Sequence, residues 1–342
     1  EIAQGTLQTL FEFQTQVARL FGVDVANASM YDGSTACWEA IVMARRITKR
    51  GKAVLSSGLH PHYVSVAKTM ARFTKDQLIY SAPVLDAAGD SADLLDQIDD
   101  DTSCVVVQYP DILGRIADLS QIAEKAHQHK ALLVAVVTEP VALGAIKSPG
   151  EMGADIVVGE GQSLGVGLQF GGPYVGLFGC KQKYVRQMPG RLCGETVDAE
   201  GKRGFVLTLS TREQHIRREK ANSNICTAQV LLANMASFYA VYHGPVGLST
   251  IANRIHRFAD ILGAGLVSKG VELAHDTWFD TLTVKIANKA DVLQKALARG
   301  MNLRADLEGT VGISLDETTT RQDILDLFDV LIGLFDECIV DC

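Results

Sequence analysis

A polar stretch near the amino end could bind an anion. The sequence YDGSTA at residues 31–36 leads into an amphipathic pattern that predicts a helix capped by Ser34 or Thr35. Unpaired backbone N–H groups and the helix dipole make such a terminus a natural place for a phosphate. The same residues would also serve as an ordinary cap after a turn. Ser34 and Thr35 are therefore candidate cofactor-binding residues, with simple capping as the alternative.

A glycine-rich segment, GVGLQFGGP at residues 165–173, joins two strand-like runs. Glycine permits positive φ and close approach of the backbone to a ligand, which makes Gly171 and Gly172 candidates for contact with a cofactor. The segment is not a P-loop, because no Gly-Lys-Ser/Thr follows. It is not a dinucleotide-binding fingerprint either, because a strand rather than a helix follows. A structural tight turn is the alternative.

The third candidate is a polar block, TREQHIRREKANSN at residues 211–224, which precedes a long helical pattern. Arginine can hold a carboxylate or a phosphate through paired donors, although such a block is more often solvated surface. Turn or helical spacing cannot aim all the arginines the same way, so we expect some to be exposed. The candidate substrate or interface residues are Arg212, His215, Arg217, Arg218 and Asn222.

No group of residues has the spacing of a metal site. His60 and His62 flank Pro61 without a third ligand, and a helix beginning at this proline explains them better. The seven cysteines show no CxxC pair, and Cys104 and Cys180 lie in apolar runs. Reduced core thiols are typical of the cytoplasm, or of an organelle matrix in a eukaryote. Cys338 and Cys342, at the tail, leave a redox role open.

The composition excludes several classes of protein. The chain has 342 residues, of which 47% are hydrophobic and 21% charged, enough for a packed core. A net charge of −8 argues against a nucleic-acid partner, which would require a basic face. No run reaches the roughly 18 apolar residues needed to cross a bilayer, so we expect no membrane partner.

The elements that must position these residues alternate along the chain. Apolar strand patterns lie at 54–56, 78–80, 103–109, 131–137, 154–159 and 174–179. Helical patterns lie at 6–21, 34–49, 62–72, 91–98 and 119–129. Apolar strands alternating with helices predict an α/β fold with a mostly parallel sheet covered on both faces. Ligands of such sheets bind at the carboxyl ends of the strands.

The carboxyl-terminal part predicts a second, smaller unit. Long helical patterns at 224–243 and 247–263 are followed by strand, helix, strand and helix patterns at 279–286, 290–299, 310–315 and 321–335. We therefore expect a large domain at residues 1–245 and a small α/β domain at residues 246–342.

Several stretches together resemble one family, glycine dehydrogenase (decarboxylating), the P-protein of the glycine cleavage system. The resemblance covers essentially the whole chain and is weakest after about residue 265. The stretches that carry it are EIAQGTL at 1–7, ANASMYDGSTA at 26–36, GQSLG at 161–165, FGGP at 170–173, MPGR at 188–191 and residues 211–227.

The resemblance implies the type I fold of pyridoxal-phosphate (PLP) enzymes, similar to aspartate aminotransferase. In this family only the β subunit, or the carboxyl-terminal half, carries the Schiff-base lysine. The corresponding place here holds Gln162, and no lysine lies between Lys147 and Lys181. The strand at 133–137 also lacks an aspartate for the pyridinium nitrogen, and Glu139 is the nearest acid. The resemblance therefore implies an α subunit with no catalytic residue of its own.

The family's activity is implied in the same way. The complete enzyme decarboxylates glycine on PLP and passes the aminomethyl group to the lipoyl arm of H-protein. We expect this chain to assemble with a PLP-carrying β subunit, as a cytoplasmic heterotetramer, through a large apolar surface. We also expect an upstream segment, which other α chains carry, to be missing before Glu1. The alternative is a non-catalytic structural subunit with a degenerate pocket.

Overall fold

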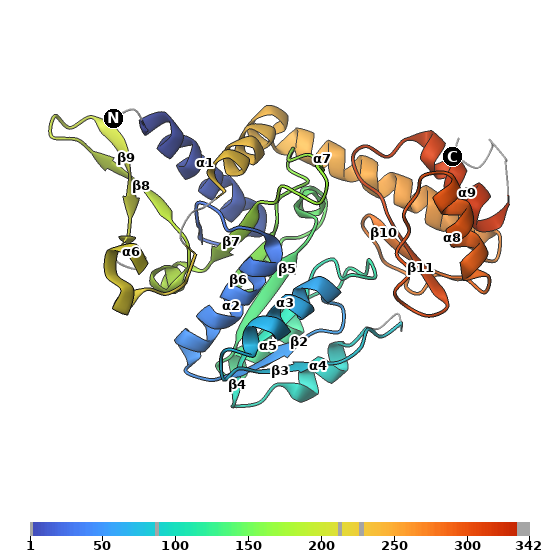
Figure 1. Cartoon of the computed structure of the whole chain (residues 1–342), viewed down its shortest axis with the longest axis horizontal. Coiled ribbons are helices and arrows are strands. Elements are labelled where there is room, and N and C mark those ends of the chain that lie inside the picture. Colours follow the sequence, from blue (N-terminus) through green and yellow to red (C-terminus); the bar gives the residue numbers. More distant parts are fainter. Residues whose placement is uncertain (1–2, 86–88, 211–213, 226–228, 334–342) are drawn as a thin grey trace.

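The computed structural model describes residues 3–85, 89–210, 214–225 and 229–333, without the side chain of His215 (Figure 1). Cys338, Cys342 and Arg212 lie outside the described residues. The strands are β1 (Val25–Ala26), β2 (Lys52–Leu55), β3 (Gln77–Tyr80), β4 (Thr102–Gln108), β5 (Leu132–Val137), β6 (Ile156–Glu160), β7 (Gly176–Cys180), β8 (Leu192–Val197), β9 (Arg203–Thr208), β10 (Thr281–Lys285) and β11 (Thr310–Ser314).

Helices alternate with the first strands, as the sequence predicts. The α-helices are α1 (Gln4–Phe21), α2 (Gly33–Thr48), α3 (Pro61–Ala71), α4 (Ser91–Gln97), α5 (Ser120–Gln128), α6 (Gln214–Arg217), α7 (Val230–Ser268), α8 (Lys289–Ala298) and α9 (Arg321–Ile332). Short 3₁₀ turns are η1 (Pro140–Gly144), η2 (Gly150–Met152), η3 (Gln182–Gln187) and η5 (Arg218–Lys220).

The main sheet has seven strands in the order β1-β7-β6-β5-β4-β2-β3. The five strands from β2 to β6 are mutually parallel, and β7 pairs antiparallel with both β6 and β1. Every residue of β4 and of β5 is buried, because helices cover both faces of the sheet. The expectation of a mostly parallel sheet is confirmed.

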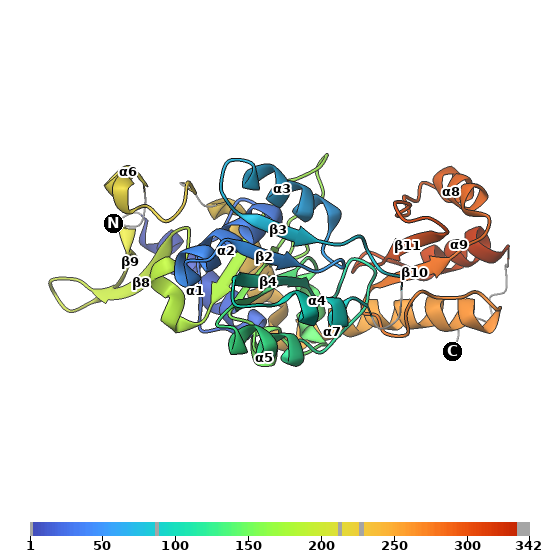
Figure 2. The ribbon, with the colours of Figure 1, turned by 90° about the horizontal axis from the view of Figure 1, so that it is seen from below.

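Side chains that alternate along each strand divide the core into two layers. Val105 and Val107 pack with α1, α5 and α7, whereas Cys104 and Val106 pack with α2 and α3. A period of two is what a pleated strand imposes. Figure 2 shows α3 and α5 on opposite sides of the sheet. This arrangement places the amino end of α2 beside the carboxyl ends of the parallel strands.

A smaller unit follows the kinked helix α7, which crosses from the main sheet to β10 and β11 (Figure 1). Gly244 has φ +61° and ψ −178°, and Pro245 follows it, so α7 consists of two helices joined at this point. β10 and β11 pair antiparallel. We propose that this kink lies at the boundary between a large domain, residues 1–245, and a small domain, residues 246–342.

A hairpin that the sequence patterns did not indicate extends from the main body (Figure 1). Its strands β8 and β9 pair antiparallel, and most of their outer residues are exposed. Two side chains of α1 hold it. Gln4 exchanges hydrogen bonds with the backbone of Phe205, and Gln14 does the same with Cys193.

Two details correct or extend the sequence reading. The predicted caps of the second helix, Ser34 and Thr35, are wrong: Asp32 is the N-cap, because its carboxylate accepts from the backbone of Thr35. The expected helix start at Pro61 is confirmed, with His60 as its cap.

Among the described residues, no helix combines the length and apolar character needed to span a bilayer, and no cluster of three acidic, histidine or cysteine side chains could hold a metal.

Candidate functional site

Polar side chains meet at the carboxyl edge of the parallel strands, where this kind of sheet binds its ligands. Gln108, at the end of β4, accepts from the backbone of His60 and donates to Thr138 Oγ1, which follows β5. Glu139 and Glu160 stand beside them, at the ends of β5 and β6. Polar side chains therefore lie at the carboxyl ends of three neighbouring strands, β4, β5 and β6.

The amino end of α2 is already capped by this chain. Asp32 Oδ1 accepts from the Thr35 nitrogen at 2.9 Å, and Oδ2 accepts from Thr35 Oγ1 at 2.6 Å. The Ser34 hydroxyl also donates to Asp32. Both hydroxyls that the sequence suggested for an anion are therefore engaged by a carboxylate, which suits the positive end of a helix.

A second carboxylate, that of Glu160, accepts a hydrogen bond from the first backbone N–H group of the same helix. Glu160 Oε2 accepts from the Gly33 nitrogen at 3.0 Å. Oε1 accepts from the nitrogens of Val175 at 2.9 Å and Gln162 at 3.1 Å. Burial raises the pKa of Glu160 to about 7, although the three N–H donors oppose this shift.

Space above the first turn of α2 is filled as well. A Cβ atom built on Gly33 would overlap Tyr63 Oη and would lie 3.0 Å from the Glu160 nitrogen and the Gly159 carbonyl carbon. The helix start therefore packs directly against the end of β6. Only glycine fits, because any larger residue would push the helix away from the strand.

Glu139 turns toward the segment that follows β6. Its Oε1 accepts from Ser163 Oγ at 2.7 Å and from the Val141 nitrogen at 2.9 Å. Burial, together with the negative charge of Asp280 in the small unit, raises the pKa of Glu139 to about 7. Oxygen Oε1 of Glu139 is thus already hydrogen-bonded to groups of this chain.

Gln162 and the glycine-rich turn lie on the other side of Glu160. Gln162 Nε2 donates to the Pro173 carbonyl at 3.0 Å, so it holds the end of the turn. Gly171 is exposed with φ +94°, and a side chain there would meet nothing within 4 Å. The turn presents Leu168 and Phe170, which are 81% and 112% exposed. The turn therefore presents two apolar side chains to the solvent.

The described part of the polar block lies near η3. Asn222 Nδ2 donates to the Arg186 carbonyl at 2.9 Å. Arg217 and Arg218 are exposed, and Arg217 pairs with Glu219 at 2.7 Å. The structure does not bring these two arginines to the carboxyl edge. Arg212 and the His215 side chain lie outside the described residues.

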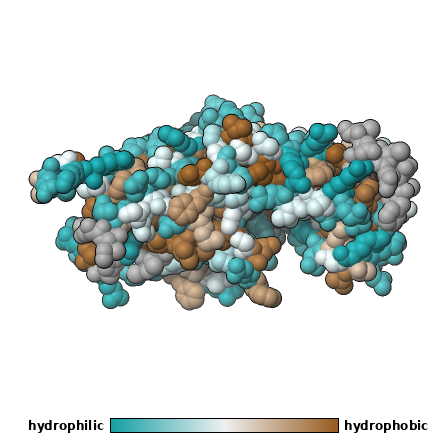
Figure 3. Space-filling model, turned by 90° about the horizontal axis from the view of Figure 1, so that it is seen from above, coloured by the Kyte–Doolittle hydropathy of each residue, from teal (hydrophilic) through white to brown (hydrophobic). Residues whose placement is uncertain are grey.

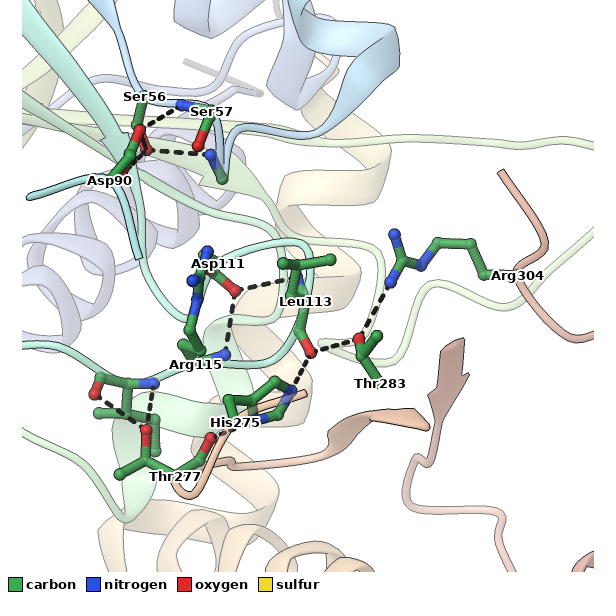
Figure 4. A network of polar contacts seen from close by, with 12 residues as sticks. Ser56, Ser57, Asp90, Asp111, Leu113, Arg115, His275, Thr277, Thr283 and Arg304 are labelled. Atoms are coloured by element: carbon green, nitrogen blue, oxygen red, sulfur yellow. Dashed lines mark hydrogen bonds and ion pairs between the residues drawn. The ribbon is translucent and has the colours of Figure 1, made fainter. Parts of the chain in front are cut away.

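A polar junction that sequence reasoning missed joins the loop after β4 to the small unit (Figure 4). The Leu113 carbonyl accepts from Thr283 Oγ1 at 2.8 Å and lies 2.5 Å from His275 Nε2. Asp111, in the same loop, holds the buried Arg115 at 2.6 Å. None of these residues belongs to a recognisable sequence motif, so only the folded structure shows that they lie together.

The family described as "Glycine cleavage system P-protein" matches residues 1–331. The chain belongs to this P-protein family. It is 61% identical over 343 residues to the probable glycine dehydrogenase (decarboxylating) subunit 1 of Novosphingobium aromaticivorans, covering 97% of this chain and 76% of the relative. The corresponding protein of Sphingopyxis alaskensis is 62% identical, with 95% and 74% covered.

Solved structures agree with this membership. The crystal structure of a glycine decarboxylase (P-protein) in inhibitor-bound form is 38% identical, with a TM-score of 0.88 over 97% of this chain and 76% of that chain. A cysteine desulfurase from Thermococcus onnurineus shares the fold at 15% identity and a TM-score of 0.69, with 98% and 86% covered. The P-protein chain described here thus has the type I fold of PLP-dependent enzymes.

The residues at the carboxyl edge of this P-protein chain do not fit PLP. A phosphate at the start of α2 would meet two carboxylates, Asp32 and Glu160, already bound to the available N–H and hydroxyl donors. The position after β6 offers the amide of Gln162 instead of an amine, and Glu139 is turned to Ser163. Glu160 was not among the sequence candidates, because a lone acid ending an apolar strand has no spacing signal.

Proposed function

We propose that this chain is the non-lysine subunit of a glycine decarboxylase in the glycine cleavage system. Together with a β subunit, it decarboxylates glycine and passes the aminomethyl group to lipoyl H-protein. The membership over residues 1–331 and the names of the relatives support this activity. A purely structural subunit is not favoured, since these relatives carry an enzyme's name.

PLP belongs to the partner subunit in this proposal. The observation that carries it is Gln162, whose amide holds the Pro173 carbonyl where an amine would be needed. When bound in the partner, PLP supplies the electron sink for loss of CO2. This chain's own contribution is to form the subunit interface and a wall of the shared cavity. In this proposal Ser34, Thr35, Gly171 and Gly172 line the remnant of a pocket. The substrate or interface contacts come from Arg212, His215, Arg217, Arg218 and Asn222.

The surface supports a partner. Leu168 and Phe170 project from the glycine-rich turn, and Leu231, Phe238 and Tyr242 are exposed on α7. Apolar patches appear over the central body in Figure 3. Large patches of exposed apolar side chains are typical of surfaces that bind another protein. We propose a heterotetramer with the β subunit, in the bacterial cytoplasm, where buried free thiols such as Cys37 and Cys193 stay reduced.

Reconstitution tests the proposal. The chain alone, the β partner alone and the mixture are assayed for glycine-dependent exchange of labelled bicarbonate, and we expect activity only in the mixture. Borohydride reduction followed by mass spectrometry should place a pyridoxyl-lysine on the β subunit. A stoichiometric pyridoxyl-lysine on this chain, or full activity of β without it, would contradict the proposal.

A further inference from the structure

We propose that Glu160 is a built-in anion, which takes at the amino end of α2 the place of a bound phosphate. Because Glu160 binds the N–H groups at this helix end, the chain has no free site for an anion at the start of α2. The inference deepens the proposed function and rests on the assignment of the cofactor to the partner subunit.

The donors around Glu160 come from three separate segments. Gly33 begins α2, Gln162 lies in the turn after β6, and Val175 precedes β7. Their backbone nitrogens lie 2.9–3.1 Å from the two carboxylate oxygens. A helix terminus combined with converging backbone N–H groups is the arrangement with which proteins bind phosphate oxygens. Here a side chain of the protein satisfies those donors.

The surrounding charges oppose a second anion. Asp32 caps the same helix from the other side, and its oxygens are bound to Thr35. Glu160 itself accepts from the Gly33 nitrogen at the start of the helix. Like charges about 4 Å apart repel by several kcal/mol at a protein surface. A phosphate dianion is therefore excluded while Glu160 carries its charge.

Removal of Glu160 leaves the helix cap intact, because Asp32 remains on the Thr35 nitrogen. Glu160→Ala in the full chain should thus fold with an open, positive helix end. The titration is made at pH 8 with inorganic phosphate at constant ionic strength. Melting temperature and calorimetric heat are recorded. We expect Glu160→Ala to bind phosphate saturably, and the wild type to show no saturation at phosphate concentrations at least about tenfold above the dissociation constant of the variant.

Two further variants make the test decisive. Glu160→Gln keeps the size of the side chain and removes its charge, so it should gain phosphate binding even if Glu160→Ala unfolds. Asp323→Ala is the control. It removes a carboxylate at the start of another helix, α9, where Asp323 accepts from the backbone of the N-cap residue Thr320, and it should gain no phosphate binding. A folded Glu160 variant without a saturable phosphate response, or an equal response in Asp323→Ala, would overturn the inference.

The two proposals fail separately. Phosphate binding is measured on this chain without its partner and without turnover. An unresponsive Glu160 variant therefore leaves the exchange assay of the reconstituted enzyme unaffected. A pyridoxyl-lysine on the wild-type chain would instead refute the assignment of the cofactor to the partner.

Discussion

Ser163 Oγ donates a 2.7 Å hydrogen bond to Glu139 Oε1, which joins the turn after β6 to the end of β5. The acid at this edge is held by a neutral hydroxyl and by the Val141 nitrogen, with Asp280 nearby. No basic partner is among the causes that shift the pKa of Glu139, so its charged form is poorly compensated. Burial, the largest cause, raises the pKa of Glu139, so this group makes the stability of the fold depend on pH.

Replacing Glu139 by glutamine should flatten part of that dependence. The folded-state pKa of Glu139, about 7, lies above its ordinary value of 4.5, so the folded chain binds more protons between these values. Stability from this group is present below about pH 4.5 and is lost as the pH rises through 7. The free energy of unfolding of Glu139→Gln relative to wild type should therefore increase from pH 5 to pH 8, measured by urea denaturation. A difference that is independent of pH would contradict this.

Gly33→Ala should destabilise the chain. The added methyl group would overlap Tyr63 Oη and press on the backbone of Glu160, at a cost of about 1–3 kcal/mol. Gly5→Ala is the matched control, because its Cβ would meet nothing within 4 Å and alanine favours a helix. Adding Tyr63→Phe should recover part of the loss. Equal thermal stability of the two glycine variants would show that the close approach is not restrictive.

Charges on the glycine-rich turn should weaken assembly. The double variant Leu168→Asp, Phe170→Asp changes two exposed side chains, so we expect its stability to stay within about 0.5 kcal/mol of wild type. Association with the β subunit, followed by sedimentation velocity, should weaken by more than about tenfold. Phe73→Asp alters a side chain that is 83% exposed after α3, and should leave association unchanged. Undiminished assembly of the double variant would place the interface elsewhere.

The arginines of the polar block should contribute little to stability. Arg217→Ala and Arg218→Ala should each cost less than about 1 kcal/mol, because both side chains are exposed. Arg115→Ala is the contrasting variant, since Arg115 is 6% exposed and paired with Asp111; its loss should cost about 3–5 kcal/mol. Urea denaturation measures all three. A large loss for either exposed arginine would show that it has a structural partner.

The main sheet could be predicted from sequence because its central strands are apolar on both faces. The uninterrupted runs in β4 and β5 are typical of parallel strands, and the helices between them follow from their spacing. The hairpin β8–β9 gives no comparable signal. Most of its outer residues are exposed, and it is held to α1 by Gln4 and Gln14, which lie far away in sequence.

The site was harder to predict than the fold. The sequence predicts an anion site or a helix cap at Ser34 and Thr35, but it does not indicate that the carboxylates of Asp32 and Glu160 bind at this helix end. Glu160 acts through nitrogens of Gly33 and Val175, 127 and 15 residues away, and no local pattern records such contacts. The inference that Gln162 stands in place of an amine rests on the resemblance to the family, because no local pattern of residues indicates it.

The carboxylate at the start of α2 also bears on how the chain matures. A protein that needs a small molecule to neutralise a helix end gains stability only when that molecule is supplied. Glu160 is covalently present from synthesis, so this helix end needs no bound small molecule to satisfy its N–H groups. On the proposed assignment of PLP to the partner subunit, a shortage of vitamin B6 would act on the partner and leave the folding of this chain unchanged.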